Sequence, residues 1–239
     1  MRMLTTALPK AAVCAVSLAC LCLAGCSGLF QSKAKPEQIY YLRAPAAPPA
    51  GADSAAAAPV AAAAMPASLW VARPSAGPGL DTPHIMLVQA DHRMNFYSGS
   101  RWPTPATQLI EALAVETLRA RGAWASVEDS ASPFPSDYIL QLHVRRFEAD
   151  YTEGAGTPVV HVLLDCIIGR RQGRDVLATF TASGASAAPA NRLGEVVGAF
   201  EQATGTALES LSQQAEQAVR GDVQHAAQNA DKPLASISR

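Results

Sequence analysis

The sequence has little charge and, beyond its first 26 residues, almost no cysteine. Charged residues make up 16% of the 239 residues, with 19 Lys and Arg against 20 Asp and Glu. No excess of basic residues is present that would hold nucleic acid. After Cys26 the only cysteine is Cys166, in an apolar run where it is expected to be a small hydrophobic residue of a strand. Nucleic-acid binding and a disulfide framework are therefore excluded.

Motifs for catalysis and metal binding are also missing. Ser98-Gly99-Ser100 lacks the Gly-x-Ser-x-Gly spacing of a nucleophile elbow, and Gly154-x-Gly156 lacks the lysine of a phosphate loop. A strand through 157–170 would place His161 and Cys166 on opposite faces, which disfavours a shared metal ion. We therefore expect no enzyme activity, no catalytic residue, no metal and no cofactor.

Residues 1–25 have the layout of a secretion signal peptide. Arg2 and Lys10 provide a positive start, residues 11–25 are apolar and uncharged, and small residues follow. The apolar run is about fifteen residues long, shorter than the roughly 20 that a membrane-spanning helix needs. A leader that is removed is therefore expected.

The end of this leader resembles the lipobox of bacterial lipoproteins. Leu23-Ala24-Gly25-Cys26 has a cysteine after two small residues and a leucine, whereas Cys20 and Cys22 lack this context. The resemblance implies that the thiol of Cys26 is acylated and that the leader is removed before it. An ordinary signal peptide with a chance cysteine is the alternative. Ser27 is not the Asp that retains enteric lipoproteins in the inner membrane, so we expect the periplasmic face of the outer membrane.

Low-complexity segments flank the expected domain at 38–220 and also interrupt it. Residues 26–37 are expected to be a lipidated tether, and the Ala/Pro-rich insert 44–68 is too poor in large apolar residues to form a core. A short alanine helix within 55–64 is the local alternative. Residues 221–239 show little apolar periodicity and are expected to be a disordered tail.

Hydrophobic periodicity predicts strands and two helices between these segments. Apolar residues that recur at helical spacing favour a helix at 107–119, capped by Thr104 or Thr107 and ended by Gly122. Strands are predicted at 68–74, 84–90, 92–98, 137–147, 157–170 and 175–183, the last three as an antiparallel meander.

The clearest element is an amphipathic helix from about 192 to 220. Its apolar residues recur at threes and fours from Leu193 to Ala218. A coiled coil made for self-association is the alternative. The order of strands, helix, strands and helix predicts an α/β domain with a mixed, partly antiparallel sheet and two main helices.

Several stretches resemble the ABC-type transport auxiliary lipoproteins, the family that includes PqiC. The resemblance rests on "QIYYLRAP" after the lipidated cysteine, on Leu80-Asp81-x-Pro83-x-Ile85, on Arg101-Trp102 before a helix, on "DYILQLHVRRFEAD" and on the long closing helix. It covers about Gln38 to Val219 and implies a domain at 38–220.

The resemblance implies a three-layer α/β/α fold, similar to anticodon-binding-like and TolB amino-terminal domains. It also implies a non-catalytic auxiliary subunit of an intermembrane lipid transport system, whose partner is the MCE-domain periplasmic protein of an ABC transporter. Some members assemble as homo-oligomeric rings. The alternative function is a regulatory or assembly lipoprotein of another envelope machine, such as a peptidoglycan synthase activator or a secretion pilotin.

One stretch, "NFYSGSRWPTP", is a candidate partner surface. Phe96, Tyr97, Arg101 and Trp102 are of the residue types that dominate the energetics of protein interfaces. The alternative is structural: Trp102 fills the core at the edge of the sheet, and Arg101 pairs with a carboxylate at the entry to the helix.

Overall fold

The computed structural model describes residues 36–44, 64–152 and 156–230. The signal peptide at 1–25, Cys26 and most of the expected 26–37 tether lie outside the described residues. Residues 37–239 group as one unit. All described core residues lie between Leu42 and Val219, so the segment 37–239 contains that complete core. No helix in the described part of the chain is long and apolar enough to cross a membrane.

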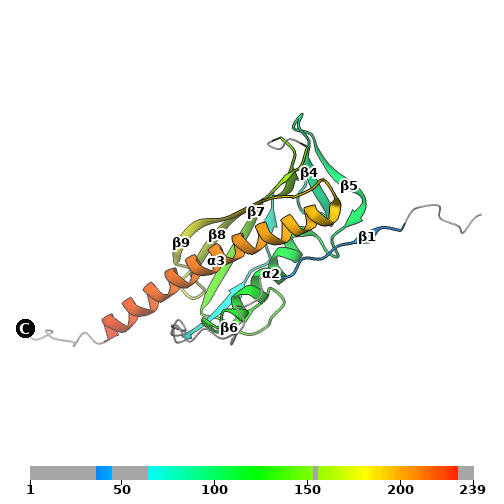
Figure 1. The fold of residues 1–239 in the computed structure, drawn as a ribbon. Helices are drawn as coiled ribbons and strands as arrows, with labels where there is room; N and C mark the ends of the chain where they lie inside the picture. The colour runs from blue at the N-terminus through cyan, green and yellow to red at the C-terminus, as the bar shows by residue number, and fades with distance from the viewer. Residues whose placement is uncertain (1–35, 45–63, 153–155, 231–239) are drawn as a thin grey trace, which may run out of the picture. The chain divides into compact units, whose positions relative to one another are not determined.

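The described residues form strands and two helices (Figure 1). In chain order they are β1 (Gln38–Ile39), β2 (Met65–Val71), β3 (Ser75–Ala76), β4 (His84–Val88), β5 (Met94–Arg101), α2 (Ala106–Ala120), β6 (Trp124–Glu128), β7 (Tyr138–Asp150), β8 (Val159–Arg170), β9 (Val176–Ala187) and α3 (Leu193–Ala230). The predicted α/β class, mixed sheet and two helices are confirmed.

Strand β7 organises the sheet. On one side it pairs with β8 in antiparallel fashion, and β8 pairs with β9, which is the predicted meander. On the other side β2, β3 and β4 pair with β7 in parallel, one after another along its length. Strand β6 extends the sheet beyond β2, and β5 and then β1 extend it beyond β4. The long β7 therefore joins two shorter groups of strands.

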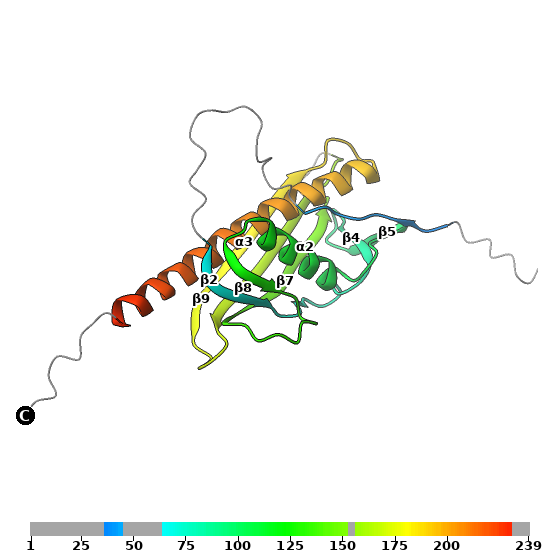
Figure 2. The same cartoon turned by 90° about the horizontal axis from the view of Figure 1, so that it is seen from below.

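Both helices cover the same face of this sheet. Buried residues alternate along β7 and β8 in matching register, as in the pairs Leu140–Ile168 and Leu142–Cys166. Helix α3 packs on β7, β8 and β9, while α2 packs on β2 and β6 and contacts α3 (Figure 2). The expected three-layer arrangement is therefore corrected to two layers in the described residues, because the apolar faces of both helices meet one apolar face of the sheet.

The boundaries of α2 agree with the prediction at one end only. Gly122 follows the helix with φ 62°, the left-handed conformation that glycine adopts most readily, so the predicted stop is confirmed. Neither predicted threonine caps the other end. The residue before the helix is Pro105, and Thr107 instead donates its hydroxyl to Asp81 Oδ1 at 2.7 Å.

Two expected low-complexity segments are shorter than predicted. Strand β2 begins at Met65, inside the expected 44–68 insert, and Met65 and Ala67 are buried in the core. Residues 45–63 of that insert lie outside the described residues. Helix α3 continues to Ala230, ten residues beyond the expected end, and Val223 in this extension packs on the core. Residues 231–239 lie outside the described residues.

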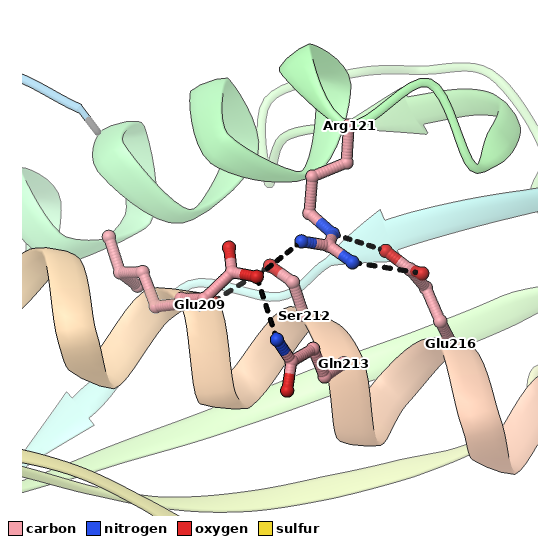
Figure 3. A network of polar contacts seen from close by, with 6 residues as sticks. Arg121, Glu209, Ser212, Gln213 and Glu216 are labelled. Atoms are coloured by element: carbon pink, nitrogen blue, oxygen red, sulfur yellow. Dashed lines mark hydrogen bonds and ion pairs between the residues drawn. The ribbon is translucent and has the colours of Figure 1, made fainter. Parts of the chain in front are cut away.

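The two helices are joined at one end by an arginine. Arg121, just after α2, contacts Glu209 through Nη1 at 2.6 Å and Glu216 through Nε at 2.6 Å (Figure 3). The two carboxylates are seven residues apart on α3, so they lie on one side of that helix. Glu216 is only 12% exposed, which makes this contact less screened by water than an ordinary surface ion pair.

We expect Arg121→Gln to lower the free energy of unfolding by about 1–2 kcal/mol, between the values typical of surface and of buried pairs. The substitution leaves the two carboxylates of α3 without their cation. Arg93→Gln is the matched control, since Arg93 and its partner Asp91 are 73% and 54% exposed. Urea unfolding at neutral pH measures both variants. Equal losses would show that the contact between α2 and α3 does not depend on this arginine.

Candidate functional site

The candidate partner stretch lies where β5 departs from regular pairing with β4. Phe96 pairs with Met86, but five residues later Arg101 pairs with His84, only two residues away on β4. The additional residues of β5 include Gly99, whose φ of 69° is favourable for glycine. This irregularity brings Phe96 and Arg101 to the same partner, His84.

Four residues lie next to one another on this edge of the sheet. The ring of Phe96 stacks on the ring of His84, with 4.6 Å between centroids. In the strand register, Arg101 lies opposite His84 on β4 and opposite Ile39 on β1. Ile39 and Phe96 are 57% and 47% exposed, high values for large apolar side chains. We call Ile39, His84, Phe96 and Arg101 the edge patch.

Arg101 is held in place by a carboxylate, as the structural alternative predicted. Its Nε lies 3.0 Å from Glu37 Oε2, in an ion pair that lacks hydrogen-bond alignment. The side chain remains 35% exposed. Arg101 therefore has both a structural contact and a surface that a partner could reach.

Trp102 does not belong to the surface, which corrects its place among the candidate partner residues. It is fully buried between Phe147, at 5.8 Å between ring centroids, and Phe200, at 5.2 Å. Its backbone N–H donates to the carbonyl of Pro83 at 2.7 Å. A large aromatic side chain has most to gain from leaving water, and the junction of β7 and α3 has room for it. The structural alternative is correct for this residue.

Tyr97 is half-buried, and its hydroxyl is part of a chain of hydrogen bonds. Its hydroxyl lies 2.9 Å from that of Tyr151, which donates to Asn191 Oδ1 at 2.7 Å. Burial, with a contribution from Tyr151, raises the pKa of Tyr97 above its usual range. Tyr97 stays neutral and links β5 to the loop before α3, so a supporting role fits it better than direct contact with a partner.

Sequence reasoning missed two members of the edge patch. Ile39 and His84 are far from Phe96 in the sequence and become its neighbours only through the pairing of β1, β5 and β4. The available signal was "QIYYLRAP", where Ile39 and Tyr41 alternate with the more buried Tyr40 and Leu42. That alternation marks a half-buried edge segment.

Other reactive side chains are apart from one another, as predicted. Cys166 is buried, and desolvation raises its pKa to about 12, so its thiol is unreactive at neutral pH. In the register of β7 and β8, His143 lies opposite Asp165 and His161 lies opposite Glu148, so the two histidines are at different heights of the sheet. Among the residues described, no group of three His, Cys, Asp or Glu side chains is arranged to hold a metal ion.

Comparison with protein families identifies the family of this chain. The family model for the ABC-type transport auxiliary lipoprotein component matches residues 51–215. The chain belongs to this family. The auxiliary lipoproteins are a component of a transport system and not a known enzyme family. The resemblance noted in the sequence is therefore confirmed.

Solved structures show the same fold for this auxiliary lipoprotein. A crystal structure of a Xanthomonas campestris protein of the DUF330 family has a TM-score of 0.62 and 26% identity, and covers 80% of this chain and 98% of its own. The crystal structure of an uncharacterized protein has a TM-score of 0.53 and 14% identity, with coverages of 79% and 99%. A search of curated proteins found no match.

Proposed function

We propose that this auxiliary lipoprotein is anchored through Cys26 to the periplasmic face of the outer membrane. There it would serve as a non-catalytic subunit of an MCE and ABC-type lipid transport system. The observation that carries the proposal is the family match over residues 51–215, supported by 26% identity to the Xanthomonas protein over nearly the whole of that chain. The lipobox before Cys26 supports the anchor.

The edge patch is the proposed surface for the MCE-domain partner or for a neighbouring copy in a ring. Exposed aromatic and aliphatic side chains beside an arginine are the usual centre of a protein interface. The patch includes Ile39 of β1, the edge strand that directly follows the expected tether in the sequence.

For the anchor, we expect Cys26→Ala to abolish acylation and to remove the mature protein from the outer-membrane fraction. The matched control is Cys22→Ala, because Cys22 lies in the same apolar run without the Leu-Ala-Gly context. Membrane fractionation and mass spectrometry of the mature amino terminus measure both. An unmodified Cys26 in the wild-type protein would overturn the localisation.

For the partner surface, we expect Phe96→Ala to weaken binding to the partner by about 2 kcal/mol, roughly thirtyfold in Kd. The melting temperature should change little, since Phe96 is half-exposed. Phe134→Ala is the matched control, because Phe134 is 66% exposed in the segment between β6 and β7.

Copurification from crosslinked cell envelopes identifies the partner, and titration with that partner measures both variants. Recovery of an MCE-domain protein with wild type and Phe134→Ala, but not with Phe96→Ala, is the expected result. Recovery of cell-wall enzymes in its place would favour another envelope machine. Equal recovery with all three proteins would exclude the edge patch as the interface.

A further inference from the structure

The face of the sheet that the helices leave open carries a cavity of about 470 Å³ at the β8–β9 hairpin. Its floor consists of Ile139 and Gln141 on β7 and of Ile167 and Gly169 on β8. These residues alternate with Leu140, Cys166 and Ile168, whose side chains face the helices, so the cavity opens away from α2 and α3. The hairpin from Arg170 to Val176 forms its wall.

The wall is rich in arginine. Arg170 is already engaged: Asp222 on α3 accepts hydrogen bonds from its Nη2 at 2.6 Å and its Nε at 2.9 Å. Burial favours the neutral form of Asp222, but the bonds from Arg170 and Tyr138 outweigh it and hold the pKa of Asp222 below its usual value. This carboxylate therefore stays charged at neutral pH and keeps Arg170 on the helix side of the sheet.

Arg171 and Arg174 are not neutralised in this way. In the described parts of the chain, neither has a carboxylate within ion-pair distance, and the one acid in the lining, Asp175, lies 4.0 Å from Arg170. Because Arg170 is directed to Asp222 on the helix side, the cavity retains the guanidinium groups of Arg171 and Arg174 and one carboxylate, that of Asp175. The cavity has one positive charge in excess.

Arg171 is held in a defined position. Its guanidinium lies over the ring of Trp70, 4.7 Å from the centroid, and its Nη1 donates to Ser136 Oγ at 3.0 Å. Its backbone N–H donates to the carbonyl of Asp137 at 2.8 Å. A guanidinium that is already oriented loses less conformational entropy when it binds a ligand.

The turn of the hairpin sets the backbone conformation of Arg174. Gly173 and Arg174 have φ of 84° and 60°, two consecutive residues in the left-handed region. A residue other than glycine adopts this conformation at a cost of about 1–2 kcal/mol, so the turn determines the backbone conformation of Arg174. The turn directs the chain so that Arg174 lines the same cavity as Arg171.

We propose that this cavity binds an organic anion with an apolar body, namely a phosphate ester of an alkyl chain. Arg171 and Arg174 would bind the phosphate oxygens, since the guanidinium matches their geometry. Ile139, Ile167 and Val176 would contact the alkyl chain, which would cover the 38% and 64% of Ile167 and Val176 now exposed. This binding site is separate from the edge patch and does not depend on the proposed partner.

Calorimetric titration of the segment 37–239 tests the site with three probes. We expect octyl phosphate, below its micelle concentration, to bind at least about tenfold more tightly than octyl glucoside or inorganic phosphate. The first comparison isolates the charge and the second isolates the alkyl chain. Equal binding of octyl phosphate and octyl glucoside would overturn the proposal.

Substitutions locate the binding in this cavity. The guanidinium of Arg174 makes no hydrogen bond or ion pair in the described parts of the chain. Arg174→Gln should therefore weaken octyl phosphate binding about tenfold without disturbing the fold, and the double change with Arg171→Gln should weaken it further. Arg145→Gln is the matched control: Arg145 is 54% exposed beside Asp165 and is not among the residues that line the cavity. Unchanged binding by Arg174→Gln, or equal loss in the control, would overturn the assignment.

The source of the phosphate ester is decided by a fourth probe, soluble dihexanoyl phosphatidylglycerol. Tighter binding of this lipid than of octyl phosphate would support the site and assign it to a lipid headgroup. Tighter binding of octyl phosphate would support the site and assign it to a free phosphate monoester. Absence of binding by both would overturn the proposal and leave the proposed partner untouched.

Discussion

Replacing Trp102 by alanine is expected to lower the free energy of unfolding by about 3–5 kcal/mol, the usual cost of deleting a buried large aromatic side chain. Trp102 has no exposed surface and joins Phe147 of β7 to Phe200 of α3. The cavity left behind would be lined by two aromatic rings that are themselves 5.1 Å apart and cannot both move into it. The melting temperature should fall by roughly 6 to 20 °C.

Trp102→Phe separates ring packing from polarity. The indole Nε1 of Trp102 is buried without a hydrogen-bond partner in the described residues, which disfavours burial of that N–H. Phenylalanine removes this group and keeps one ring, so the loss should be about 1 kcal/mol or less. Phe134→Ala, at an exposed position, should change stability by no more than about 0.5 kcal/mol. A loss below about 1 kcal/mol for Trp102→Ala would contradict the burial.

Gly184→Ala is expected to destabilise the protein by about 3 kcal/mol or more, beyond the usual range for an added methylene group. Among the glycines of the strands, Gly184 on β9 lies closest to α3. An added Cβ would overlap sterically with the carbonyl oxygen of Ala203 and lie 3.0 Å from the amide nitrogen of Ala207. Both obstacles are backbone atoms of α3, which cannot rotate away as a side chain can.

Gly198→Ala is the matched control and should have the opposite sign. Gly198 is an exposed residue of α3, and a Cβ added there would have no atom within 4 Å. Alanine in a helix interior is favoured over glycine by roughly 0.5–1 kcal/mol, so the variant should gain stability. Thermal and urea unfolding measure both substitutions. A neutral Gly184→Ala would show that α3 lies farther from β9 than the structure has it.

Much of the fold was predictable because its periodicity is local. The alternation in β7 and β8 and the apolar stripe of α3 each identify an element and its buried face from neighbouring residues alone. Strand β6 was missed, since its buried residues Trp124 and Val127 are three apart and show no alternation. The start of β2 was missed because Met65 and Ala67 continue an alanine-rich run that looks like a linker.

The candidate site was only partly predictable. "NFYSGSRWPTP" contains Phe96 and Arg101, which remain on the surface, beside Trp102, which is buried. Residue type alone could not separate them, because aromatic side chains favour protein interiors and protein interfaces for the same reason. Ile39 and His84 joined the patch through strand pairing across more than ten residues of sequence.

Three conclusions follow from the order of the residues: the family, the sheet-forming and helix-forming segments, and the expectation of a lipid on Cys26. Each of them depends on a short motif or on a local period. From the three-dimensional structure alone follow the single helical layer, the burial of Trp102, the edge patch and the arginine-lined cavity. These four depend on which distant segments meet. That choice is made by burying the largest shared apolar surface, a property of the whole domain and not of any one segment.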